Sequence, residues 1–125
     1  MAFPQTETNP QAGPALSKAV IRAATTLGLN KSTVAAILGV SGATVSRLFA
    51  GTYVLDPRDR KTWEHSALFV RLYRSIDSLL GHDSQAQTWL RGRNTALNAR
   101  PLDLITSSEG LVRVVTYLDG YRGRV

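Results

Sequence analysis

Residues 31–50 read KSTVAAILGVSGATVSRLFA, and this stretch decides the fold. Ala35 occupies a position where two helices cross closely and a larger side chain would clash. Gly39 follows four residues later, where the chain must turn and glycine adopts a left-handed backbone at little cost. The apolar contacts between the two short helices come from Val34, Leu38, Val40, Val45 and Leu48. The pattern predicts a helix-turn-helix unit, although two core helices joined by a glycine turn would share it.

The second helix of this unit presents small and polar groups that suit a DNA major groove. Ser41 precedes it as an N-cap, with a hydroxyl that accepts a backbone N–H. We expect Arg47 and Thr44 to contact base edges. The complete set of expected DNA-binding residues is Lys31, Ser41, Ala43, Thr44, Ser46 and Arg47.

The chain has 125 residues, which suffices for one domain or for two small domains that share a core. Its net charge of +6 comes from 15 Lys and Arg against 9 Asp and Glu, and such an excess favours nucleic acid as a partner. The excess is spread over both halves. Residues 1–52 hold four basic groups and one acid, which gives +3, and the rest of the chain carries the other half of the +6. We therefore expect one copy to bind DNA modestly and a homodimer or a larger complex to bind it better.

Several classes of protein are disfavoured. Cysteine is absent, so disulfides and thiolate metal sites are excluded, and a cytoplasmic location is expected. No apolar run approaches the roughly 18 residues that span a bilayer, and the first residues do not resemble a signal peptide. His65 and His82 stand apart, without a serine or carboxylate constellation, and both are interpreted as structural, with His65 on a helix surface. We expect no catalytic residue, no metal site and no cofactor.

The periodicity of apolar residues predicts an all-α fold. Residues 1–14 are expected to be a disordered tail, 15–55 a helix-turn-helix domain, 56–81 a long connecting and dimerisation helix, and 82–125 a small helical C-terminal domain. Asp56 and Pro57 read as the N-cap and first turn of the long helix, whose apolar positions surround much of its circumference. Ser107 or Ser108 is expected to cap a last helix that Gly120 breaks.

From Trp89 the chain reads WLRGRNTALNARPLDLITSSEGLVRVVTYLDGYRGRV. This stretch resembles the C-terminal toxin-binding domain of the MbcA/ParS/Xre antitoxins, and the preceding helix-turn-helix is its expected companion. The positions that carry the resemblance are Trp89, Leu90, Asn94, Leu97, Pro101, Leu102, Thr106, Glu109, Gly110, Val115 and Leu118. One departure is Asn98-Ala99, where the family often has glycines. Asn tolerates a left-handed backbone, so the turn can survive.

The resemblance implies an antitoxin that covers the active-site cleft of a RES-domain toxin, an enzyme that consumes NAD or uses it for ADP-ribosylation. It also implies repression of the antitoxin's own operon through the helix-turn-helix. Carried onto this chain, the toxin-facing surface comprises the 92–100 loop and the end of the last helix. The residues expected there are Arg91, Arg93, Tyr117, Tyr121, Arg122 and Arg124. The alternative is a transcription regulator whose C-terminal domain only dimerises or senses a ligand.

Overall fold

The computed structural model describes residues 10–81 and 83–122, except for the side chain of Arg122. These residues form α-helices without strands, and an isolated antiparallel bridge joins Asn94 to Ala99. The helices are α1 (Ala12–Thr26), α2 (Lys31–Leu38), α3 (Gly42–Ala50), α4 (Arg60–Leu80), α5 (Asp83–Arg91), α6 (Pro101–Leu104) and α7 (Ser108–Arg122). The expected all-α class is confirmed. Because Ala12–Pro14 belong to α1, the expected disordered tail is wrong for those residues, and residues 1–9 lie outside the described part.

Helices α2 and α3 form the predicted helix-turn-helix. The side chain of Asn30 caps α2 by accepting from the Thr33 backbone N–H at 2.8 Å, and that of Ser41 caps α3 by accepting from Thr44 N–H at 3.1 Å. Gly39 ends α2 with φ 72°, the left-handed conformation that favours glycine. The two helices meet at 108°, within the range typical of this motif. Among the described residues, no single helix is long and apolar enough to cross a membrane; α2 and α3 reach that length only as this bent pair.

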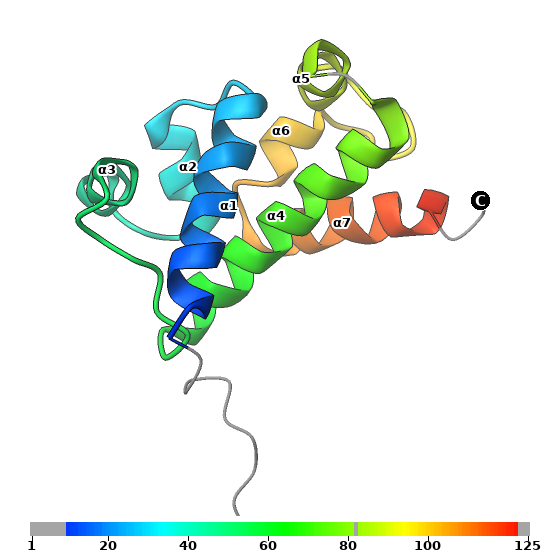
Figure 1. Cartoon of the computed structure of the whole chain (residues 1–125). Coiled ribbons are helices and arrows are strands. Elements are labelled where there is room, and N and C mark those ends of the chain that lie inside the picture. The colour runs from blue at the N-terminus through cyan, green and yellow to red at the C-terminus, as the bar shows by residue number, and fades with distance from the viewer. Residues whose placement is uncertain (1–9, 82, 123–125) are drawn as a thin grey trace, which may run out of the picture.

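Helix α4 is the spine of the molecule. It packs against α1 and α2 on one side and against α5 and α7 on the other, as Figure 1 shows. Its side chains Phe69, Leu72 and Ile76 are fully buried in a core to which both halves of the chain contribute. The sequence-based expectation of a helix buried on two sides is therefore confirmed.

The start of α4 differs from the prediction. The helix begins at Arg60, with Asp59 in the N-cap position, instead of at Asp56 and Pro57. Asp56 accepts hydrogen bonds from the backbone and guanidinium N–H groups of Arg58, which hold the Asp56 pKa below its ordinary value. This local turn competes with helix initiation, because the carboxylate that would cap the helix is already engaged.

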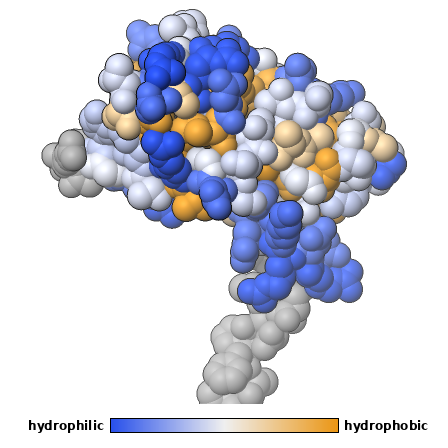
Figure 2. Space-filling view, turned by 180° about the vertical axis from the view of Figure 1, so that it is seen from behind, coloured by the Kyte–Doolittle hydropathy of each residue, from blue (hydrophilic) through white to orange (hydrophobic). Residues whose placement is uncertain are grey.

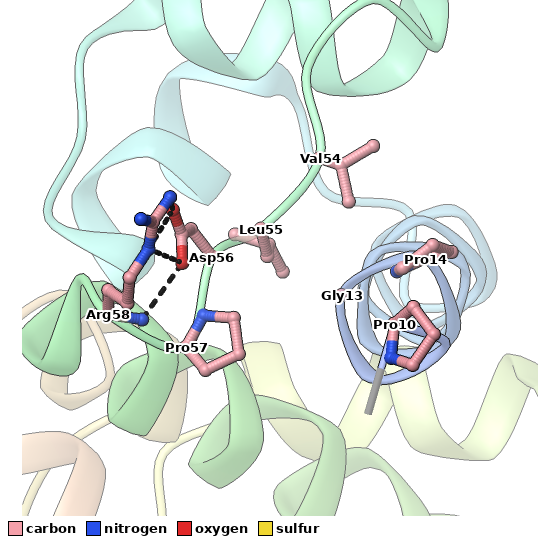
Figure 3. Close-up of a pocket in the computed structure, with 8 residues that line it drawn as sticks. All are labelled: Pro10, Gly13, Pro14, Val54, Leu55, Asp56, Pro57 and Arg58. Atoms are coloured by element: carbon pink, nitrogen blue, oxygen red, sulfur yellow. Dashed lines mark hydrogen bonds and ion pairs between the residues drawn. The ribbon is translucent and has the colours of Figure 1, made fainter. Parts of the chain in front are cut away.

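The connector between α3 and α4 is clamped onto α1. The Ser17 hydroxyl donates to Gly13 O at 2.8 Å and accepts from Leu55 N at 2.9 Å. A Cβ atom on Gly13 would lie 2.5 Å from Leu55 O, so only glycine allows this approach. A shallow pocket of about 490 Å³ lies beside the clamp, lined partly by prolines (Figure 3). The connector is therefore packed against α1, with Leu55 buried and Val54 exposed.

In the C-terminal part of the chain, α6 packs against α7. Pro101 begins α6, and Ser107, one of the two predicted caps, caps α7 by accepting from Gly110 N–H at 3.1 Å. Glu109 lies in the first turn of α7, where a carboxylate stabilises the positive end of the helix. The expected break at Gly120 is wrong. The helix continues through Gly120 to Arg122, because Leu118 is buried and Asp119 pairs with Arg71 at 2.7 Å.

Candidate nucleic-acid and partner-binding surfaces

The outer face of α3 carries most of the predicted DNA-binding residues. Ser41, Ala43, Ser46 and Arg47 are exposed, and Thr44 is half-buried. The Arg47 guanidinium donates to Thr44 Oγ1 at 3.3 Å, and Thr44 Oγ1 lies 3.0 Å from Ser41 Oγ. These bonds form a chain along one face, so the Arg47 side chain is oriented before any ligand arrives.

Lys31, the first residue of α2, lies near the C-terminal end of α3, whereas Ser41 lies at the N-terminal end of α3. The Lys31 ammonium group is 6.0 Å from the centre of the Phe49 ring, a cation–π distance, and Phe49 belongs to the last turn of α3. The structure therefore places Lys31 on α2 beside the C-terminal end of α3, while Ser41 lies at its N-terminal end. A DNA-binding surface that includes both Lys31 and Ser41 therefore extends along the whole length of α3.

The 92–100 loop is tied to α7 by polar contacts. Asn94 exchanges backbone hydrogen bonds with Ala99, and its side chain accepts from Leu97 N–H at 3.0 Å. Arg113 of α7 donates to Leu97 O at 2.7 Å. Asn98 has φ 56°, so asparagine adopts the left-handed conformation that the sequence analysis anticipated for it. The loop therefore has a defined shape that α7 holds in place.

Two tyrosines of α7 lie next to the 92–100 loop. The amide of Asn94 lies 3.5 Å from the Tyr117 hydroxyl, which lies 3.2 Å from that of Tyr121, and the two rings meet edge to face at 5.1 Å. Tyr121 is 45% exposed. Arg93 precedes Asn94 in the loop, and its guanidinium donates to the Asn98 side chain. The structure thus brings together Tyr117 and Tyr121 from the predicted set and bonds Arg93 within the loop.

Comparison with known proteins identifies both halves of the chain. The model of the antitoxin Xre-like helix-turn-helix domain matches residues 10–71, and that of the antitoxin Xre/MbcA/ParS C-terminal toxin-binding domain matches residues 76–124. The chain belongs to the Xre/MbcA/ParS antitoxin family. It is similar to a chain in the crystal structure of the M. tuberculosis MbcT–MbcA toxin–antitoxin complex, with a TM-score of 0.65 and 26% identity over 88% of this chain and 96% of that chain. No curated protein matches the sequence.

The remaining residues of the predicted toxin-binding set are placed differently in the antitoxin. The guanidinium of Arg91 donates to Leu27 O at 3.0 Å and to Gly28 O at 2.8 Å, at the C-terminal end of α1. Arg91 therefore joins the two halves of the chain, a role that accounts for it without a partner protein. Nothing is described of the Arg122 side chain, and Arg124 lies outside the described residues.

The sequence interpretation took His65 as a structural residue on a helix surface, and the structure shows it bonded to two other segments. It is half-buried, and its Nδ1 lies 3.0 Å from Ile37 O while its Nε2 lies 3.0 Å from Ser108 Oγ. Both partners are distant in sequence, so no local pattern could reveal them. His82, expected at a helix junction, lies outside the described residues.

Exposed hydrophobic side chains are scattered over the described part of the antitoxin. The large ones are Val54, Leu79, Val112 and Tyr121. Figure 2 shows hydrophobic areas interrupted by hydrophilic ones on the face opposite to that of Figure 1. On α7, Val112 and Tyr121 are nine residues apart and so point to roughly opposite sides of the helix. Tyr121 lies on the side that faces the loop, whereas Val112 does not.

Proposed function

We propose that this chain is a non-enzymatic antitoxin that neutralises a RES-domain toxin and represses its own operon, with both partners in the cytoplasm. The toxin consumes NAD or uses it for ADP-ribosylation, and the C-terminal domain covers its active-site cleft. The observation that carries the proposal is the pairing of the two family domains in one chain, at residues 10–71 and 76–124. Figure 1 places α3 and the C-terminal end of α7 at opposite ends of the molecule, so DNA and toxin can be bound together.

The chemistry of α3 supports the DNA half of this proposal. Gly42 and Ala43 leave room for the helix to approach base edges closely. Arg47 can donate two parallel hydrogen bonds to guanine, and the Thr44 hydroxyl next to it both donates and accepts. The net charge is modest for a DNA-binding protein, which favours a homodimer that places two copies of α3 about one helical turn apart on DNA.

The tyrosines and arginines near the end of α7 support the toxin half. Tyr and Arg dominate the binding energy of protein interfaces, because they bury a large area and still satisfy polar groups. We propose that Arg93, Tyr117 and Tyr121 form one toxin-binding surface and that Arg122 and Arg124 extend it. Because the Arg91 guanidinium is bonded within the chain, the proposed interface relies on the other five residues.

Arg47→Ala tests the DNA half. A duplex from the DNA upstream of this gene should bind the wild-type chain, and the substitution should weaken that binding by about 1–3 kcal/mol. Arg74→Ala is the matched control, because it removes the same charge from an exposed position on α4. Equal affinities for the Arg47 variant and wild type would contradict the assignment of α3 as the recognition helix.

Co-expression tests the toxin half. The chain should be co-purified with the product of a neighbouring gene of RES-domain size and should restore growth to cells that make that product. A chain that binds its promoter but neither captures nor neutralises the neighbour would instead be a transcription regulator whose C-terminal domain dimerises or senses a ligand.

A further inference from the structure

One side chain connects the end of α2 to the start of α7. His65 of α4 lies between the Ile37 carbonyl, in the last turn of α2, and the hydroxyl of Ser108, the first residue of α7. Both distances are 3.0 Å, and the ring is half-buried between the two segments. The Xre-like helix-turn-helix and the toxin-binding domain therefore meet at this imidazole.

The bond to Ile37 acts at the turn that orients α3. The last four carbonyls of a helix lack an intrahelical partner, and Ile37 O is one of them. The turn has no side chain of its own at Gly39, where a Cβ would lie 3.7 Å from Lys61 Cε and 3.8 Å from His65 Nδ1. The surface of α4 therefore lies against the turn, and the His65 bond holds the last turn of α2 against α4.

Ser108 orients the imidazole ring that makes this bond. A carbonyl can only accept, so Nδ1 carries the hydrogen, and Nε2 of the neutral ring accepts from the Ser108 hydroxyl. Ser108 is itself held in place, because the Ser107 cap and the close approach of Gly110 to Leu104 fix the start of α7. The Ile37 carbonyl thus selects the tautomer, and the Ser108 hydroxyl sets the rotation of the ring.

We propose that His65 is a positioning residue for DNA binding and that Ser108, in the toxin-binding domain, orients it. A hydroxyl group on the last helix, hydrogen-bonded to His65 of α4, thereby raises the operator affinity of α3. The proposal rests on the proposed DNA binding and adds to it a role for the other domain.

Three variants separate the two bonds of His65. His65→Asn keeps an N–H donor at the Nδ1 position for Ile37 O and loses Ser108. His65→Gln keeps a group at the Nε2 position for Ser108 and loses Ile37. Ser108→Ala removes only the orienting hydroxyl. Thr116→Ala is the control, since it removes an exposed hydroxyl further along α7.

The measurement is the dissociation constant of each variant for a duplex from the DNA upstream of this gene. His65→Gln should bind about tenfold more weakly than wild type, and Ser108→Ala and His65→Asn about threefold, the range that one intramolecular hydrogen bond supplies. Ser108→Ala should have no further effect in the His65→Asn background, because the bond it removes is already gone. Thr116→Ala should match wild type.

Two further readouts separate positioning from folding and from the proposed function. Melting temperatures and capture of the toxin should be close to wild type for Ser108→Ala, whose altered residue is exposed. Wild-type affinity in Ser108→Ala, or an equal loss in His65→Asn and His65→Gln, would overturn this inference alone. Failure of the wild-type chain to bind the duplex would overturn the proposed DNA binding and this inference with it.

Discussion

Gly110 is the residue whose replacement should damage the C-terminal domain most. A Cβ atom added to it would overlap the carbonyl oxygen, the carbonyl carbon and the Cα of Leu104. All three are backbone atoms, so no change of side-chain rotamer relieves the overlap. Leu104 cannot recede, because Ile105 N donates to Pro101 O at 3.1 Å and the Ile105 side chain is fully buried.

Gly110→Ala must therefore push α6 and α7 apart. Overpacking a rigid core costs about 1–3 kcal/mol, and separation of the two helices adds lost contacts of the buried Ile105 and Leu111. We expect a loss of about 3 kcal/mol or more, a large fraction of the 5–15 kcal/mol typical of a domain. For a chain of this size such a loss lowers the melting temperature by about 10 °C.

Gly120→Ala is the matched control for this prediction. It adds the same atom to the same helix, but among the described residues no atom beyond its chain neighbours and its own helix backbone lies within 4 Å of the added Cβ. Because alanine is the better helix former, Gly120→Ala should stabilise the chain by about 0.5–1 kcal/mol. Thermal and urea unfolding followed by circular dichroism measure both variants. A melting temperature for Gly110→Ala within about 2 °C of wild type would refute the argument from close packing.

Three further substitutions test other contacts. Arg91→Ala should lower the free energy of unfolding by about 1–3 kcal/mol, because it leaves carbonyls at the end of α1 without their charged donor; chemical denaturation measures this, and an unchanged midpoint would contradict it. Tyr121→Ala should weaken toxin binding at least about tenfold while leaving the melting temperature unchanged, and Val112→Ala, exposed on the other side of α7, should do neither; titration calorimetry compares the two. Arg100→Ala should raise the pKa of Asp103, which hydrogen bonds from that guanidinium now lower, so an NMR titration should find the carboxyl protonating at higher pH than in wild type.

The helix-turn-helix could be predicted from sequence because its determinants are local. Asn30 and Ser41 each cap a helix by bonding a backbone N–H three residues away, and Gly39 adopts the left-handed conformation that its place in the pattern requires. The same local reasoning misplaced the start of α4, because Asp56 and Pro57 carry the residue types of a helix start. The Arg58 guanidinium bonds to the Asp56 carboxylate, so Asp56 does not cap the helix and α4 begins later, at Arg60.

The contacts that join the two halves could not be predicted in this way. Arg91 bonds to Leu27, 64 residues away, and His65 bonds to Ser108, 43 residues away. Each bond joins a side chain to a group whose position depends on the packing of other helices. A polar residue that serves such a contact has no characteristic spacing, so Arg91 was interpreted as a binding residue and His65 as a surface residue.

These contacts also determine how the two functions can be separated experimentally. The family domains meet between residues 71 and 76, inside α4, where Leu72 and Ile76 are fully buried in the common core. A cut at that boundary would expose both side chains and would also break the bonds of Arg91 and His65. Loss of DNA binding in a truncated chain would then report unfolding, not the removal of a toxin-binding surface. Point substitutions on α3 and on the end of α7 leave the core intact, so they can assign each activity to its own surface.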